Sequence, residues 1–244
     1  MKIIVMYPDR MGKHSLGDFG ENLLNFTKNF PEITFQPTPI INGGEVTELR
    51  SIYEKVRKIG FDGATTYESE GGLSSILYRG YDWIEFCEQN PDTIIVRMDT
   101  NEHPVSKIIE IATLAQNELC LSIFERELNE KNASPEEILA NNQTFPCLYK
   151  AMTNGKVCLS NTHGFQAMSV GTLKKIWPHV RNLIPLNNSW GMDAVMALSA
   201  SVVGVKIIQK SYYLEEKRQR GVEKIEEQLR SHVELLMNAR RFFV

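Results

Sequence analysis

Potential metal ligands follow directly on a run of residues that suits a buried strand, in the segment "IIVRMDTNEHP" that begins at Ile94. Four side chains in this segment carry oxygen or nitrogen donors: Asp99, Asn101, Glu102 and His103. Mg²⁺ and Mn²⁺ take oxygen ligands, usually one or two carboxylates completed by phosphates and water. Asp99 offers a carboxylate, Asn101 a carbonyl oxygen and His103 a neutral nitrogen. The segment therefore predicts a divalent-cation site, although Asp99 and Asn101 can also simply cap the helix expected from Val105.

A second group of candidate residues lies in "NSWGMD". Asp193 opens a run of small and apolar residues that reads as a helix. Its carboxylate can act as a general base that deprotonates an acceptor hydroxyl, or it can serve only as a helix-terminal charge favoured by the dipole. Trp190 is either a platform for stacking a sugar or part of the core.

Cations follow an expected strand in "VKIIQKSYY", within the segment "KRQRGVEK". Arg218, Arg220 and Lys224 suit contacts with phosphate, because arginine forms bidentate hydrogen bonds to it. The alternative is a solvated charge run, since signs alternate in "EEKRQR". In "NTHGFQ", His163 and Gln166 are candidates for lining an acceptor pocket, although a histidine before glycine is also common in turns.

Composition restricts the classes of function. Hydrophobic residues make up 42% of the 244 residues and charged residues 23%, which is ordinary for a globular domain. The net charge of −3 argues against a nucleic-acid partner held by bulk electrostatics. No apolar run approaches the roughly 18 residues that a membrane span needs. The four cysteines are far apart and form no CxxC motif, so we expect a reduced, cytoplasmic protein.

Strand and helix patterns alternate along the first half of the chain. Strands are expected at 2–7, 33–40, 63–68, 94–98 and 119–126, and helices at 20–30, 45–60, 72–90 and 105–116. Such alternation predicts one α/β domain, with a mostly parallel, twisted sheet flanked by helices on both faces. Ligands of these sheets bind beyond the carboxyl ends of the strands, and Asp99 lies at such an end.

The alternation is interrupted at 127–157, which we interpret as a mobile loop with one short helix. Ser134 is its expected N-cap, Pro135 its first residue, and Glu137 completes a capping box. The pattern then resumes from "GFQAMS" to a charged amphipathic helix at 222–243. A single domain at 1–244 is expected, with a nucleotide-sugar half at 1–126 and an acceptor half at 158–244.

Several of these segments, in this order, resemble family 2 glycosyltransferases of the GT-A fold, especially the polyprenyl-phosphate sugar synthase branch. "VRMDTNEHP" resembles a strand-end Asp-Ala-Asp followed by Gln-His-Pro, and "HGFQAMSVGTLKKIWP" resembles Gly-Phe-Arg with a helix that runs to a proline. "GGLSSILYRG" stands where the family has a glycine-rich turn leading into a helix. "KRQRGVEK" is similar to Arg-x-x-Gly-x-Ser-Lys at Arg218, Gly221 and Lys224, with Glu223 in place of the serine.

The resemblance implies a glycosyltransferase of the hexosyltransferase type that moves a sugar from a nucleotide-diphospho-sugar donor, by an inverting attack assisted by Mg²⁺ or Mn²⁺. The acceptor is a sugar, a lipid phosphate or another small molecule. The nucleoside is expected near Tyr7, Pro8 and Asp9, after the first strand. Asn42 stands where the family has a nucleotide-binding aspartate, and Asn101 where it has the second acid of Asp-x-Asp.

Two other classes stay open at this point. Asn42 and Asn101 would also suit a non-catalytic, glycosyltransferase-like protein that binds a nucleotide or a partner. A nucleotidyltransferase on a similar sheet is disfavoured, because no glycine-rich loop ending in Arg or Lys follows the first strand.

Overall fold

A seven-stranded sheet forms the centre of the molecule, with strand order β3-β2-β1-β4-β6-β5-β7. This computed structural model describes residues 1–62, 64–65, 72–116, 119–183, 191–217 and 220–243. The strands are β1 Lys2–Arg10, β2 Thr34–Asn42, β3 Ala64–Thr65, β4 Ile94–Arg97, β5 Cys120–Arg126, β6 Phe165–Ser169 and β7 Lys206–Tyr212.

The sheet is mostly parallel, as the sequence predicts. β6 is the antiparallel member and pairs with both β4 and β5. The other strand pairs are parallel, so the carboxyl ends of β1, β2 and β4 point to the same edge of the sheet. Asp99 lies just beyond β4 and therefore at this edge.

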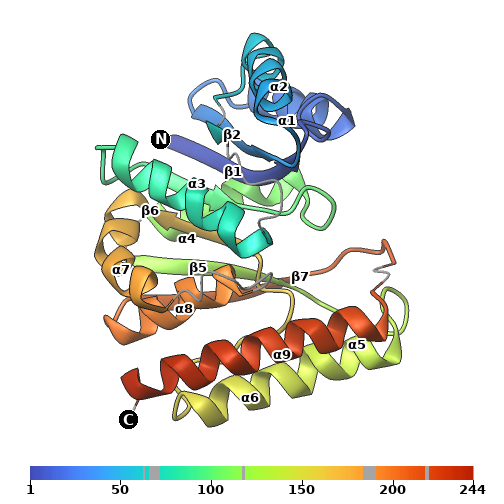
Figure 1. The fold of residues 1–244 in the computed structure, drawn as a ribbon, viewed down its shortest axis with the longest axis vertical. Helices are drawn as coiled ribbons and strands as arrows, with labels where there is room; N and C mark the ends of the chain where they lie inside the picture. Colours follow the sequence, from blue (N-terminus) through green and yellow to red (C-terminus); the bar gives the residue numbers. More distant parts are fainter. Residues whose placement is uncertain (63, 66–71, 117–118, 184–190, 218–219, 244) are drawn as a thin grey trace.

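Helices cover both faces of the sheet (Figure 1). They are α1 Asp18–Lys28, α2 Val46–Lys58, α3 Leu73–Cys87, α4 Ile108–Gln116, α5 Pro135–Leu139, α6 Phe145–Met152, α7 Val170–Leu183, α8 Met192–Val202 and α9 Val222–Ala239. Short 3-10 turns at Val105–Lys107 and Arg240–Phe242 precede α4 and follow α9. Figure 1 shows α1 and α2 at one end of the molecule and α5, α6 and α9 packed together at the other.

The core has two layers because side chains alternate along each strand. In β1, Ile4 and Met6 pack with α3, α6, α7, α8 and α9 on one face. Ile3, Val5 and Tyr7 pack with α1, α2 and α4 on the other face. Burial of both faces explains why the strands read as nearly continuous apolar runs.

Two prolines lie within β2 and remove backbone hydrogen-bond donors from it. Pro37 and Pro39 lie opposite Val5 and Tyr7 in an unbroken register with β1. Residues two apart direct their N–H groups to the same side of a strand, so both prolines remove donors from one side only. In the described part of the chain, β3 pairs with β2 just beyond Pro39, at Ile40 and Ile41.

The prediction of one short helix in 127–157 is wrong. After the predicted N-cap at Ser134, the chain stays helical through α5, a π-helical turn at Ala140–Thr144, and α6. The many polar residues in this segment are untypical of a buried helix, so the sequence did not indicate one. Phe145 and Tyr149 are nevertheless buried against α9 and stabilise the helical conformation.

A second correction concerns Pro178, which was expected to end a helix. α7 continues through it to Leu183, because Trp177 and Val180 on either side are buried in the core and hold both turns. Among the described residues, no helix has both the length and the apolar character that crossing a membrane requires.

Candidate functional site

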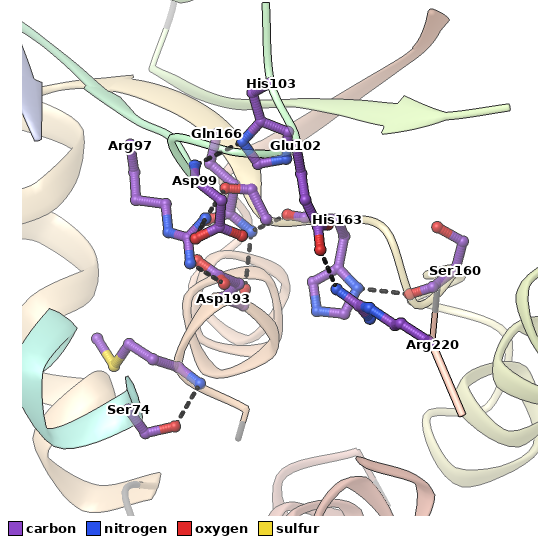
Figure 2. Close-up of polar contacts among 12 residues, drawn as sticks. Ser74, Arg97, Asp99, Glu102, His103, Ser160, His163, Gln166, Asp193 and Arg220 are labelled. Carbon is purple, nitrogen blue, oxygen red and sulfur yellow. Dashed lines mark hydrogen bonds and ion pairs between the residues drawn. The ribbon is translucent and has the colours of Figure 1, made fainter. Parts of the chain in front are cut away.

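A buried arginine at the end of β4 joins two carboxylates from distant parts of the chain. Arg97 is fully buried, and its Nη1 lies 3.0 Å from Oδ1 of Asp99 while its Nη2 lies 3.0 Å from Oδ2 of Asp193. Nη1 also donates a hydrogen bond to the carbonyl oxygen of Gly164 at 2.5 Å. A Cβ atom at Gly164 would lie 2.8 Å from Nη1, so the absence of a side chain there permits this contact. Figure 2 shows the guanidinium between the two carboxylates.

Asp193 is held in the first turn of α8 by contacts to two other elements. Gly191, just before the helix, has a φ of 119°, a conformation that favours glycine. Ser74 on α3 accepts a hydrogen bond from the backbone N–H of Met192 at 3.2 Å. Gln166 on β6 donates to the carbonyl oxygen of Asp193 at 2.9 Å and to that of His163 at 3.0 Å. Gln166 is fully buried and positions both residues through their backbones.

The environment of Asp193 suits proton transfer. Its side chain is only 14% exposed. Burial raises the pKa of Asp193 to about 7, with Arg97 opposing the rise and Asp99 adding to it. A carboxylate with a pKa near physiological pH can both accept and release a proton during a reaction.

Three potential metal ligands lie together beyond β4. One ligand atom each of Asp99, Glu102 and His103 falls within 4.8 Å of the others. A turn produces this arrangement, because the backbone N–H groups of Glu102 and His103 both donate to the carbonyl oxygen of Asp99. The structure thus places Glu102, rather than Asn101, beside Asp99. Asn101 is exposed and does not line the cavity at this site.

The donor set fits a hard divalent cation through its carboxylates. Asp99 and Glu102 supply the two carboxylates that Mg²⁺ or Mn²⁺ commonly takes from a protein. His103 accepts a hydrogen bond at Nδ1 from the backbone N–H of Asp99 at 2.6 Å. A neutral imidazole that accepts at Nδ1 carries its proton on Nε2, so neither nitrogen offers a free lone pair in this state. His103 also stacks on Phe165, with ring centroids 4.9 Å apart, and so positions the turn.

The guanidinium of Arg220 forms an ion pair with the carboxylate of Glu102. Its Nη2 lies 2.7 Å from Oε1 of Glu102, and its Nη1 donates to Oε1 of Gln228 at 3.1 Å. Its Nε lies 4.0 Å from Oε1 of Glu137, which is fully buried. Glu137 was expected to complete a capping box with Ser134, but its side chain packs toward Arg220 instead. A cation bound at Glu102 must compete with Arg220.

A cavity of about 50 Å³ connects these groups. The residues that line it include Arg97, Asp99, Glu102, His103, Asn161, His163, Asp193, Arg220, Gln228 and His232. His163 is buried, and its Nδ1 lies 2.5 Å from the carbonyl oxygen of Ser160, as Figure 2 shows. The sequence-predicted residues Asp99, His103, His163, Asp193 and Arg220 therefore share one cavity.

The residues expected near the nucleoside form a separate group at the ends of β1 and β2. The carboxylate of Asp9 accepts hydrogen bonds from the backbone N–H groups of His14 and Ser15 and from the Ser15 hydroxyl. Tyr7 is buried and its hydroxyl lies 2.9 Å from that of Ser15. The carbonyl oxygen of Asn42 accepts from the N–H of Met11, and half-buried Pro8 lies between Tyr7 and Asp9.

This group shapes the loop after β1, and none of its members lines the cavity. Lys224 is exposed at the start of α9 and also lies outside the cavity lining. Trp190 and Arg218 lie outside the residues that the structure describes.

Sequence reasoning did not assign roles to Arg97, Asn161, Gln228 and His232, and it selected Asn101 over Glu102. Arg97 could have been selected from the sequence, because a charged residue inside a buried strand needs a charged or hydrogen-bonding partner. Glu102 lies in the same ligand-rich segment, and only the turn geometry distinguishes it from Asn101. Gln228 and His232 are buried positions on a helix rich in charge, and nothing local marks them.

Comparisons with known proteins bear on the fold. The sequence matches no family profile and no curated protein. Mannosyl-3-phosphoglycerate synthase from Rubrobacter xylanophilus is similar in structure, with a TM-score of 0.61 and 9% identity over 99% of this chain and 74% of that one. Residues 1–349 of TarS from S. aureus, in complex with UDP-GlcNAc, give a TM-score of 0.54 and 14% identity over 93% of this chain and 61% of that one.

A 4-diphosphocytidyl-2C-methyl-D-erythritol synthase gives a TM-score of 0.52 and 13% identity, over 93% of this chain and 98% of that one. At these identities the likeness concerns the fold. The chain is a single α/β domain with a GT-A-like fold, as its sequence motifs imply.

Proposed function

We propose that this protein is a glycosyltransferase that moves a sugar from a nucleotide-diphospho-sugar to an acceptor, with Mg²⁺ or Mn²⁺ held by Asp99 and Glu102. The observation that carries the proposal is the convergence of these two carboxylates and Asp193 on one cavity at the carboxyl end of β4. In open α/β sheets this edge is where ligands bind.

The charge of the cavity explains why a cation is needed. Among its described lining residues, the three carboxylates of Asp99, Glu102 and Asp193 face the two guanidinium groups of Arg97 and Arg220. With Asp193 ionised, this wall is negative and repels a diphosphate. A divalent cation reverses the sign, and when bound it offsets the charge that develops on the leaving nucleoside diphosphate.

The residues of the chain then account for the transfer itself. An ionised Asp193 accepts the proton of an acceptor hydroxyl while the hydroxyl oxygen forms a bond to the anomeric carbon. The bond between that carbon and the diphosphate oxygen breaks, and its electron pair leaves with the nucleoside diphosphate. Arg97 keeps the carboxylate oriented. Resemblance to family 2 supports inversion at the anomeric carbon.

The fold neighbours support the class of donor. The TarS structure contains UDP-GlcNAc, a nucleotide sugar. The likeness to a diphosphocytidyl-methylerythritol synthase would also suit a nucleotidyltransferase, but this class is disfavoured because no glycine-rich loop ending in Arg or Lys follows β1. The nucleoside side of the site is proposed to consist of Tyr7, Pro8, Asp9 and Asn42.

We place the protein in the cytoplasm, because its four cysteines are free.

The test combines binding and turnover. A panel of nucleotide sugars is screened by thermal unfolding with and without Mn²⁺, and release of nucleoside diphosphate is then measured for any that bind. A donor at 100 times its Kd stabilises the fold by about 2.7 kcal/mol, which raises the Tm by roughly 5–10 °C for a chain of this size.

Two aspartates flanking β4 provide a matched pair of variants. Asp99→Asn should abolish the effect of Mn²⁺ on donor binding. Asp92→Asn changes an exposed aspartate just before the strand and should leave it intact. Equal responses in both variants would count against the site, and donor binding without turnover would favour a non-catalytic protein.

A further inference from the structure

The inner wall of the cavity is built from amide and imidazole side chains, which can form hydrogen bonds. Asn161 and His163 come from the segment before β6, and Gln228 and His232 come from α9. The rings of His163 and His232 lie 5.5 Å apart at 76°. Nδ1 of His232 lies 2.5 Å from the hydroxyl of Tyr149 on α6, which fixes the orientation of the imidazole.

Asn161 is the group on this wall that lacks partners. The residue is only 8% exposed, and neither the nitrogen nor the oxygen of its amide makes a hydrogen bond to any residue that the structure describes. Leaving a buried polar atom unsatisfied costs about 1–3 kcal/mol, so most buried polar atoms are paired. A ligand hydroxyl can satisfy both amide atoms, because it donates to the oxygen and accepts from the nitrogen.

The carboxylates of the same cavity disfavour an anionic ligand. Both arginines of the described cavity lining are already paired, Arg97 with two aspartates and Arg220 with Glu102. Burial, and then the neighbouring His163, lower the pKa of His232 to about 3, so this imidazole is neutral at physiological pH. A phosphate placed here would meet the carboxylates of Asp99, Glu102 and Asp193, and both arginines of the described lining are already paired with these carboxylates.

We infer that this inner wall is the acceptor subsite of the transferase, and that Asn161, His163 and His232 bind an uncharged hydroxyl group of a sugar or polyol rather than a phosphate. The inference rests on the proposed function and narrows its acceptor to one class. Asp193 lines the same cavity, so the wall and the proposed base face one shared space. The cavity of about 50 Å³ holds a few hydroxyl-sized groups, while the remainder of the acceptor extends outward.

The test follows the imidazole signals of the five histidines in the full-length protein by NMR. His163→Gln and His232→Gln assign the two cavity histidines. Glycerol, D-glucose, D-mannose and D-galactose are titrated as uncharged probes, and inorganic phosphate and glycerol 3-phosphate as anionic ones, at constant ionic strength. We expect saturable shifts of the His163 and His232 imidazole signals with at least one uncharged probe and no such shifts with inorganic phosphate. The signal of His179 on α7 should not shift with the uncharged probes or with inorganic phosphate.

Matched asparagine variants test the role of the amide. Asn161→Leu should raise the Kd of the responding probe about tenfold, as expected for one lost hydrogen bond. Asn141→Leu changes a similarly buried asparagine that does not line this cavity, and should leave the Kd unchanged. If leucine at 161 disturbs folding, Asn161→Ser keeps one hydroxyl and should raise the Kd a few-fold.

The outcomes separate the subsite from the proposed function. Shifts of His163 and His232 by inorganic phosphate, or no saturable shift with any uncharged probe, would overturn the acceptor assignment even if a nucleotide sugar binds. Uncharged binding that depends on Asn161 would support the subsite even if no nucleotide sugar binds, in which case the proposed transferase activity is what fails.

Discussion

Replacing Arg97 with methionine is expected to lower the free energy of unfolding by about 3 kcal/mol at pH 8. Methionine fills a similar length of buried space without a charge. The change therefore removes the common partner of Asp99 and Asp193, each 3.0 Å from the guanidinium, and leaves two carboxylates facing one another.

The magnitude follows from burial. Breaking a buried ion pair by removing one partner typically costs about 3–5 kcal/mol. Arg97 is fully buried, but the side chains of Asp99 and Asp193 keep 27% and 14% of their exposure, so water reaches the carboxylates in part. That places the expected loss at the lower end of the range.

The loss should also depend on pH. The pKa of Asp193 is about 7 in the folded protein and about 3.9 in an unfolded chain. The folded state therefore binds the extra proton between these values, and stability falls as the pH rises from about 4 to 7. Asp193→Asn should remove this fall. In Arg97→Met the pKa of Asp193 rises further, so the variant loses less at pH 5, where Asp193 is protonated in both proteins.

Urea unfolding followed by circular dichroism at pH 5 and pH 8 measures both effects. Arg181→Met is the control, because this arginine is 53% exposed and its ion pair with Asp82 should contribute under about 1 kcal/mol. A loss below about 1 kcal/mol for Arg97→Met at pH 8, or equal losses at the two pH values, would refute the view that Arg97 balances both carboxylates.

Two further predictions concern the cation site. Glu102→Gln should weaken Mn²⁺ binding about tenfold, the effect of losing about 1.4 kcal/mol from one carboxylate ligand, whereas Asn101→Ala should leave the affinity within about twofold. Isothermal titration calorimetry with Mn²⁺ compares the two variants. A larger loss for Asn101→Ala would mean that Asn101, and not Glu102, binds the cation beside Asp99. Arg220→Gln, combined with Glu137→Gln so that no buried carboxylate loses its nearby cation, should tighten Mn²⁺ binding several-fold, because the guanidinium that competes for Glu102 is gone. Unchanged affinity would mean that Arg220 and the metal do not share Glu102.

The positions of Asp99 and Asp193 could be predicted because each depends on local order along the chain. An apolar run marks β4 as buried, and parallel pairing brings its end to the ligand edge of the sheet. The small and apolar residues after Asp193 likewise mark the start of a helix. Such arguments use neighbouring residues and need no knowledge of the packing.

The remaining site depends on contacts between distant segments. His232 faces the cavity only because α9 packs against α6 and beside the segment of His163. The interpretation of 127–157 as a loop removed α6 from the prediction, and with it Tyr149, the partner of His232. Asn161 carries no local signal either, since an asparagine near a glycine reads as a turn residue.

The two arginines of the cavity differ in how readily a cation can replace them. Arg97 has three partners, including the carbonyl oxygen of Gly164, and no exposure, so displacing it would leave a buried guanidinium without compensation. Arg220 pairs with Glu102, whose side chain is 26% exposed, and keeps a hydrogen bond to Gln228 when that pair breaks. A divalent cation entering from solvent would therefore compete with Arg220 and leave Arg97 in place. Arg220 would then keep Gln228 and the buried carboxylate of Glu137 as neighbours, so the loss of its pair with Glu102 is partly compensated.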